Sequence, residues 1–189
     1  RAAGDLGNAA RFAEAAGDKA LTANALDRAR AQYTASLQAL DEMNPRPREL
    51  PRQWCRVAQK LGMACVFDPL NLEDGLALFE RAVILSRETG EHDVMARAEY
   101  WLAYIYYAKG LPRLAATHCQ FALDWNASTG DARLAAQINA TLGQVHVAAG
   151  EYARALPLLD QAVQSKRVQS KPGNAVAIDN ASNIRLYNN

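Results

Sequence analysis

The sequence has almost no net charge and no long apolar run. Its 21 basic and 20 acidic residues leave a formal charge of +1, so it lacks the positive field that draws proteins to nucleic acids or to anionic membrane surfaces. No stretch of eighteen apolar residues occurs, and a transmembrane helix needs about that length. We therefore expect neither a nucleic acid nor a membrane as a partner.

Cysteine is also scarce. Cys55, Cys65 and Cys119 are odd in number and lack the C-x-x-C spacing of zinc and redox motifs. They fit reduced thiols that are buried as small apolar side chains, which predicts a cytoplasmic location. The sequence begins with Arg1 rather than methionine, and we expect it to be part of a longer protein.

Motifs for catalysis or cofactor binding are missing as well. The sequence contains no phosphate-binding glycine loop, dinucleotide fingerprint, H-E-x-x-H or G-x-S-x-G. The isolated histidines His92, His118 and His146 are better explained as solvated or singly bonded side chains than as a metal site. Acidic residues such as Glu80 and Glu88 fit a solvated surface better than an acid–base pair. The sequence predicts no catalytic residue, cofactor or metal.

Alanine, by contrast, is abundant within the hydrophobic content of 50%. Alanine has the highest intrinsic helix propensity, and its small side chain allows helices to approach closely. Runs of valine and isoleucine, which favour strands, are few. The composition predicts an all-α protein without a β-sheet.

The stretch from Asp131 to Val163 has the pattern of a complete helical hairpin. Gly150 separates two amphipathic segments, and Gly143 lies twelve residues before Ala155. Small residues at these positions allow the two helices to cross at a separation of about 8–10 Å. The residues predicted to face the hairpin interior lie at helical spacing and are Ala136, Ile138, Leu142, Val145, Ala149, Tyr152, Ala155, Leu159, Ala162 and Val163.

The same hairpin recurs with a period of about 40 residues. An earlier and weaker copy keeps Gly17 and Ala29, with Tyr33 in the place of later Phe79 and Leu159. The recurring small residues are Gly62, Ala103 and Gly143 on first helices and Gly75, Ala115 and Ala155 on second helices. Gly90 and Gly130 are predicted to end the helices that precede them. A fixed period of this kind is typical of a repeat architecture.

The period predicts one domain, residues 1–189, that consists of four helical hairpins and a final helix. The four units are expected at about 9–43, 50–88, 93–128 and 131–166. Helices of about 15–17 residues fill a unit of this length. A last helix at about 174–186 is expected to cover the open end of the stack, as terminal repeats must.

The units from Trp54 to Val163 resemble tetratricopeptide (TPR) repeats, and residues 9–40 do so less closely. The resemblance implies a right-handed superhelical solenoid of antiparallel helix pairs, with the first helix of each pair along a concave, partner-binding groove. Certain segments are also similar to the C-terminal arrays of large bacterial signalling proteins that carry a class III nucleotide cyclase and an ATPase module. These segments are QKLGMACVFDP, GLALFERAV, RAEYWLAYIYYAKG and LAAQINATLGQ.

The cyclase resemblance implies adenylate or guanylate cyclase activity for the parent protein. None of a cyclase's metal-binding or base-reading residues maps onto this chain, so we expect no catalysis by this part. The TPR resemblance implies a scaffold for a protein or peptide, or for another domain of the same chain. The alternative function is a ligand-binding or catalytic helical domain, including a part of a nucleotide cyclase.

A stripe of tyrosines marks the predicted groove. Arg97, Tyr100, Tyr104 and Tyr107 advance by three, four and three residues along one side of a helix. Exposed tyrosines are enriched at protein interfaces, although these tyrosines would equally well fill the space between units. The full set of predicted groove residues is Arg56, Gln59, Met63, Arg97, Tyr100, Tyr104, Tyr107, Gln137 and Gln144.

The predicted ligand of this groove is an extended or helical segment with apolar anchors. A free peptide C-terminus is not expected, because the lysine and asparagine ligands of the carboxylate clamp in chaperone-binding TPR proteins are absent. The corresponding positions hold Gln59, Met63, Tyr100 and Tyr104.

A cluster of arginines is the second candidate site. Arg46, Arg48, Arg52 and Arg56 lie close in sequence to Trp54. Such a cluster either forms a small patch for an anion or belongs to a solvated connector.

Overall fold

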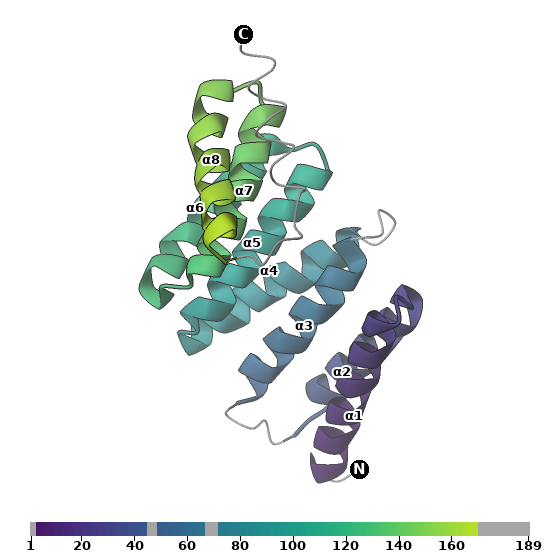
Figure 1. The fold of residues 1–189 in the computed structure, drawn as a ribbon. Coiled ribbons are helices and arrows are strands. Elements are labelled where there is room, and N and C mark those ends of the chain that lie inside the picture. Colours follow the sequence, from purple (N-terminus) through teal and green to yellow (C-terminus); the bar gives the residue numbers. More distant parts are fainter. Residues whose placement is uncertain (1–2, 45–48, 67–71, 170–189) are drawn as a thin grey trace. The chain divides into compact units, whose positions relative to one another are not determined.

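The computed structural model describes residues 3–44, 49–66 and 72–169, and the regular structure in these ranges is entirely helical (Figure 1). The eight helices of these ranges are α1 (Ala3–Thr22), α2 (Leu26–Asp41), α3 (Leu50–Val66), α4 (Leu72–Thr89), α5 (His92–Ala108), α6 (Pro112–Thr129), α7 (Ala132–Ala148) and α8 (Tyr152–Gln169). The helix predicted at 174–186 lies outside the described residues.

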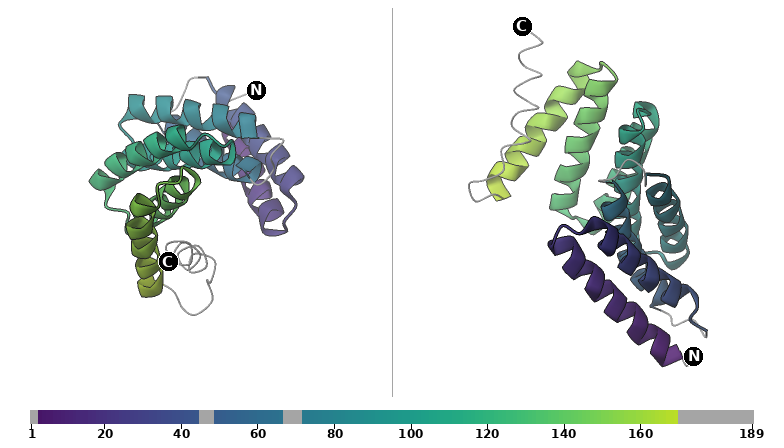
Figure 2. Two further views of the ribbon diagram at one scale, coloured as in Figure 1. Left: turned by 90° about the horizontal axis from the view of Figure 1, so that it is seen from above. Right: turned by 90° about the vertical axis from the view of Figure 1, so that its right-hand side faces the viewer.

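The chain divides into two compact units, Arg1–Trp101 and Leu102–Asn189. In the first unit α1 packs on α2, α2 on α3, and α3 on α4. In the second unit α6 packs on α7 and α7 on α8. Figures 1 and 2 show α1 beside α2 and α7 beside α8 as antiparallel pairs. The predicted pairing of consecutive helices is therefore confirmed for these hairpins.

The turns between helices recur as regularly as the helices. Gly90, Gly110, Gly130 and Gly150 have φ angles of 71°, 72°, 67° and 75°, a left-handed conformation that glycine adopts without steric cost. Asn24, with φ 55°, follows Gly17 by seven residues, as Gly150 follows Gly143. Turns within and between hairpins thus alternate every 20 residues from Gly90 onward, and the prediction for Gly90 and Gly130 is confirmed.

The glycines at the helix crossings fit against large side chains of the paired helix. A Cβ atom added to Gly62 would lie 2.0 Å from the Phe79 ring. Similar additions at Gly17 and Gly143 would approach Tyr33 and Leu159 to 2.5 and 2.6 Å. The repeat pattern predicts a small residue opposite each glycine, whereas the atoms nearest to a Cβ on Gly62 belong to Phe79.

The third hairpin has different residues at the two equivalent positions. Ala103 and Cys119 hold the positions of Gly143 and Leu159, 40 residues earlier. Both residues have no exposed surface. An alanine in place of glycine adds a methyl group, and a cysteine in place of leucine removes volume, so the two changes compensate.

Three details differ from the sequence-based expectations. The first hairpin begins at Ala3 instead of about residue 9. Helices α2, α3, α5 and α7 contain 16 or 17 residues, as predicted, whereas α1 contains 20 and α4, α6 and α8 contain 18 each. Tyr152 is 44% exposed, because it is the first residue of α8 and lies beyond the crossing, and Ala149 is exposed as well.

Candidate functional site

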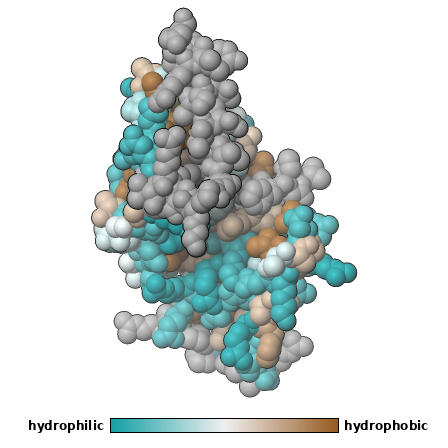
Figure 3. Space-filling model, in the orientation of Figure 1, coloured by the Kyte–Doolittle hydropathy of each residue, from teal (hydrophilic) through white to brown (hydrophobic). Residues whose placement is uncertain are grey.

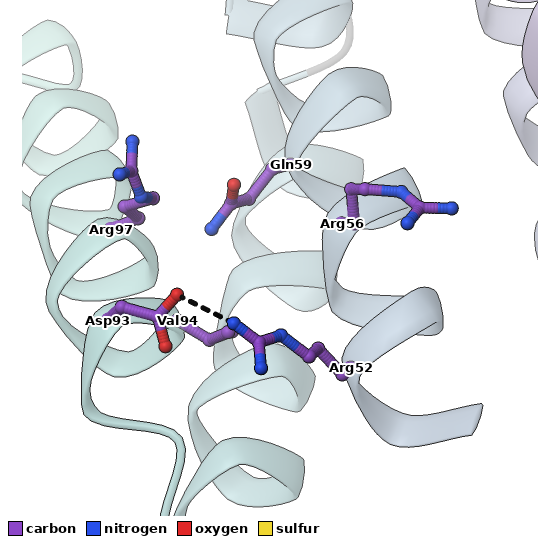
Figure 4. Close-up of a pocket in the computed structure, with 6 residues that line it drawn as sticks. All are labelled: Arg52, Arg56, Gln59, Asp93, Val94 and Arg97. Carbon is purple, nitrogen blue, oxygen red and sulfur yellow. Dashed lines mark ion pairs between the residues drawn. The ribbon is translucent and has the colours of Figure 1, made fainter. Parts of the chain in front are cut away.

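A hollow of about 260 Å³ lies between α3 and α5 in the first unit. Its lining residues, shown in Figure 4, are Arg52, Arg56, Gln59, Asp93, Val94 and Arg97. The first three lie on one face of α3 at steps of four and three residues, and the others lie in the first two turns of α5. We refer to this feature as the α3–α5 hollow. It brings together three of the predicted groove residues, Arg56, Gln59 and Arg97.

Arg52 crosses the lower edge of the α3–α5 hollow. Its guanidinium lies 3.5 Å from Glu91 Oε2 and 3.5 Å from Asp93 Oδ2, the second of which is drawn in Figure 4. The Arg52 side chain is 61% exposed, and exposed ion pairs of this length contribute about 0–1 kcal/mol. These two contacts are therefore weak enough for an incoming carboxylate to replace them.

Arg56 points away from the α3–α5 hollow, as Figure 4 shows. Its guanidinium donates two hydrogen bonds to Glu14 of α1, Nε to Oε1 at 3.0 Å and Nη2 to Oε2 at 2.9 Å. This two-point geometry is the strong form of an arginine–carboxylate pair. Arg56 thus joins α3 to α1 and contributes to the wall of the hollow mainly through its stem.

Lys60 extends this network along α3. Its ammonium donates to Glu14 Oε1 at 2.9 Å and to Asp18 Oδ2 at 2.8 Å. The Tyr33 hydroxyl of α2 donates to the other Asp18 oxygen at 2.9 Å. Three helices are therefore tied together by one set of charged hydrogen bonds, which we call the Glu14 network and which comprises Glu14, Asp18, Tyr33, Arg56 and Lys60.

The Glu14 network shifts the ionisation of its members. Burial by itself raises the pKa of Glu14, but the hydrogen bonds from Arg56 and Lys60 outweigh it, so the pKa is lowered. The pKa of Asp18 is lowered in the same way, with burial opposed by the hydrogen bonds from Lys60 and Tyr33. Burial by itself lowers the pKa of Lys60, but the hydrogen bonds to Asp18 and Glu14 outweigh it, so the pKa is raised. The charged forms are thus mutually stabilised.

This network was not predicted, although the sequence contains a signal for it. Glu14 and Asp18 are four residues apart on α1, and Arg56 and Lys60 are four residues apart on α3. Residues four apart share one face of a helix. Two acidic residues on one first helix therefore match two basic residues on the next first helix, both across 42 residues of sequence.

The other predicted groove residues are divided between the two units. In the first unit Met63 and Tyr100 are half-buried and Arg97 is exposed. In the second unit the half-buried residues are Tyr104, Tyr107 and Gln144, whereas Gln137 is exposed. On the other side of α5, Leu102 and Ile105 are buried at 3% and 0% exposure, as predicted for the packed side of the tyrosine stripe.

Trp54 does not belong to the candidate arginine cluster on the surface. Trp54 is only 1% exposed, and the Arg81 guanidinium lies 4.1 Å above its ring. The tryptophan is a core residue covered by a cation–π contact, and it does not offer a surface for an anion. Arg46 and Arg48 lie outside the described residues.

The remaining polar and thiol groups indicate structural roles. Burial raises the pKa of Cys55 to about 11 and that of Cys119 to about 12, which keeps both thiols protonated and unreactive at neutral pH. His146 Nδ1 lies 2.7 Å from Glu151 Oε2. Within the described ranges, no three histidine, cysteine or acidic residues are grouped so as to hold a metal ion.

The described helices include none that combines the length and the apolar character required to span a bilayer. Hydrophilic residues cover most of the coloured surface in Figure 3, and hydrophobic residues occur there in small groups.

The fold of this chain is similar to that of several solved structures. The apo form of RapI matches with a TM-score of 0.77 and 16% identity over 93% of this chain and 68% of that chain. BtubC from P. vanneervenii matches with a TM-score of 0.75 and 15% identity over 95% of this chain and 72% of that chain. MamA matches with a TM-score of 0.62 and 21% identity over 94% of this chain and 81% of that chain. The fold is TPR-like.

These similarities concern the TPR-like fold alone, because each identity is below 25%. They confirm the predicted fold class of an all-α array of antiparallel helix pairs. No family model matches the sequence, and a sequence search of curated proteins finds no match. The comparisons give no support to the cyclase resemblance, which stays a prediction.

Proposed function

We propose that this TPR-like chain is a protein-interaction scaffold that binds a segment of a partner protein at the α3–α5 hollow. The observation that carries the proposal is that Gln59 and Arg97, both predicted partner-binding residues, line one hollow on two first helices, with the stem of Arg56 in its wall. Another domain of the same chain would be an equally suitable source of the segment. The proposal concerns the first unit, where the lining residues all lie.

The chemistry of the α3–α5 hollow favours an acidic side chain of the partner. Three arginines and one aspartate line it, and Arg56 is already engaged by Glu14. Arg52 and Arg97 are exposed, and the Arg52 contacts are long at 3.5 Å. A glutamate or aspartate of the ligand therefore gains charge-assisted hydrogen bonds, while the half-buried amide of Gln59 offers a further donor.

The charged and apolar residues that line the α3–α5 hollow indicate what kind of segment fits it. Val94 is 7% exposed and provides a small apolar contact beside the charged groups. An extended or helical segment that places an acidic residue next to an apolar anchor fits this combination. We expect no binding of a free C-terminus, because Gln59, Met63, Tyr100 and Tyr104 occupy the positions where the lysine and asparagine ligands of a carboxylate clamp would be required.

The test is selection of binding segments from a displayed library of random peptides without free C-termini. Wild-type chain should enrich peptides that contain aspartate or glutamate next to an apolar residue. The variant Gln59→Ala/Arg97→Ala should lose at least tenfold in affinity for a selected peptide, measured by fluorescence anisotropy. It leaves Arg56 and the Glu14 network unchanged, so the fold is expected to be retained.

A matched control is Gln38→Ala/Arg87→Ala, which removes an exposed glutamine and an exposed arginine from the second helices α2 and α4. This control should bind the selected peptide as wild type does. The proposal fails if selection yields no acidic preference, or if both double variants bind the peptide equally well.

The second candidate function, a ligand-binding or catalytic domain that includes part of a nucleotide cyclase, rests only on the sequence resemblance. We expect no cyclic nucleotide from purified chain incubated with ATP or GTP and Mg²⁺. Cyclic product that is lost on a single substitution in this chain would replace the scaffold proposal with an enzymatic one.

A further inference from the structure

The outer face of α6 carries an apolar stripe that is open to solvent. Leu111, Leu114 and Phe121 are 42%, 46% and 46% exposed. His118 lies between them, with its ring 5.0 Å from the Tyr106 ring and 6.1 Å from the Phe121 ring. At about 100° per residue, Leu114, His118 and Phe121 fall within a sector of about 60° of the helix. We call this feature, all within the second unit, the α6 stripe.

The internal repeat shows that this stripe is specific to the third hairpin. The residues 40 positions before and after Leu114 are Asp74 and Arg154, and those before and after Phe121 are Arg81 and Gln161. All four are exposed, as Leu114 and Phe121 are. These positions therefore face solvent in the second, third and fourth hairpins, and among these three only α6 has apolar residues there. Adjacent exposed apolar side chains on one helix face indicate a surface that another molecule covers.

The charges beside the α6 stripe indicate which molecule covers it. Arg113 lies near the start of α6 and Asp124 near its end, and both are exposed. Helix geometry places both about 80–100° from Leu114, on the same flank of the stripe. Suppose that two copies of α6 pack antiparallel, related by a two-fold axis perpendicular to the plane that contains both helices. The same flank of each helix then lies on the same side of the contact, and the two helices run in opposite directions. Arg113 then lies opposite Asp124 of the second copy, and the converse pair forms at the other end.

We infer that the α6 stripe binds the α6 stripe of a second copy of this chain, with the two helices antiparallel and the two-fold axis near His118. Leu114 of each copy packs against Phe121 of the other. Two Arg113–Asp124 ion pairs flank this apolar contact. The inference concerns the outer face of α6 and is independent of the α3–α5 hollow.

The expected association is weak. Two helices that meet along one stripe bury less than the roughly 800 Å² per partner of a standard interface. We therefore expect a dissociation constant on the order of micromolar or above. Sedimentation equilibrium of the full 189-residue chain over a wide concentration range should show a reversible monomer–dimer equilibrium.

The first test replaces the α6 stripe with the residues that the second hairpin has at the same positions. Leu114→Asp/Phe121→Arg should weaken dimerisation at least tenfold. Its control is Arg154→Asp/Gln161→Arg, which introduces the same two residues at the matching positions of α8 and should dimerise as wild type does. Circular dichroism and thermal unfolding should show that both variants are folded, because all four positions are exposed.

The second test examines the antiparallel orientation. Arg113→Asp alone and Asp124→Arg alone should each weaken dimerisation about two- to fivefold at low salt, since each places like charges opposite each other. An equimolar mixture of the two variants should recover the wild-type affinity as a heterodimer, because each end then holds opposite charges.

Three results would overturn the inference. The first is a chain that stays monomeric at all concentrations. The second is a dimer that is as stable with the Leu114→Asp/Phe121→Arg substitutions as without them. The third is a mixture of the two charge variants that shows no preference for the heterodimer. The last result would mean that the α6 helices do not pair in antiparallel orientation.

Discussion

Glu14 of α1 and Arg56 of α3, which are 42 residues apart in the sequence, are joined by two hydrogen bonds of 3.0 and 2.9 Å. The Glu14 side chain is only 9% exposed, whereas that of Arg56 is 58% exposed. A buried carboxylate is stable in its charged form only when donors surround it. Arg56 and Lys60 supply these donors, so the first helices of the first two hairpins are connected by charge as well as by apolar contact.

Removal of the Glu14 charge should destabilise the first unit. Glu14→Gln keeps the size of the side chain but leaves Arg56 and Lys60 without their shared acceptor charge. Because both cations retain access to water, we expect a loss of about 1–3 kcal/mol in the free energy of unfolding. Urea denaturation measures it. The exposed Glu42→Gln is the control and should change the free energy by less than about 0.5 kcal/mol. Equal effects of the two changes would contradict a structural role for the pair.

The Glu14 network should also contribute to stability in a pH-dependent way. The pKa values of Glu14 and Asp18 are lowered from their ordinary values of 4.5 and 3.8. The unfolded chain therefore binds more protons in the acidic range, and the stabilisation is present above these values and lost as the pH falls through the lower, folded-state pKa values. The raised pKa of Lys60 has the opposite sense, with stabilisation lost only in strongly alkaline solution.

The measurement compares wild type with Glu14→Gln/Asp18→Asn by urea denaturation between pH 3 and pH 8. The difference in unfolding free energy should be constant near neutrality and shrink below about pH 4. A difference that grows on acidification would show that the carboxylates are held in their neutral form.

The close fit of Gly62 against Phe79 predicts a specific non-additive effect. Gly62→Ala should cost about 1–3 kcal/mol, since a Cβ atom would lie 2.0 Å from the ring and the ring must move. Phe79→Cys alone should cost about 3–5 kcal/mol through the cavity that it leaves.

The double variant Gly62→Ala/Phe79→Cys introduces the residues that the third hairpin has at the equivalent positions, Ala103 and Cys119. Its cost should be smaller than the sum of the two single costs, by more than about 0.5 kcal/mol. Thermal or urea unfolding of all three variants gives this coupling energy. Strict additivity would mean that the alanine and the ring do not compete for the same space.

The tyrosine stripe on α5 gives a prediction that separates binding from packing. Tyr100 and Tyr104 are both half-buried. If they act as interface residues, Tyr100→Ala/Tyr104→Ala should weaken capture of a selected peptide by about 2 kcal/mol or more while the melting temperature stays close to that of wild type. Unfolding of the double variant at ordinary temperature would instead identify the tyrosines as core residues. Leu102→Ala, at a position that is 3% exposed, serves as the reference for a true core substitution.

Much of the helical framework could be predicted from the sequence, because the signals that define it are local. Glycines with positive φ at Gly90 and Gly130 end helices through the conformation of a single residue. The period of small residues, with Gly143 and Ala155 as one pair, identified which helices lie side by side. The repeat pattern does not predict the start of α1 at Ala3, because the first turns are held by tertiary contacts, with Leu6 only 7% exposed.

The candidate site depended on tertiary structure. Trp54 and Arg56 are two residues apart, yet one is 1% exposed and the other reaches Glu14 across 42 residues of sequence. Which side of α3 faces α1 and which faces α5 is decided by how neighbouring hairpins stack, and that arrangement is the result of many apolar contacts acting together. Sequence periodicity fixes the faces of a helix, but only the packing of its neighbours decides which face is covered, which is paired by charge and which stays open to a partner.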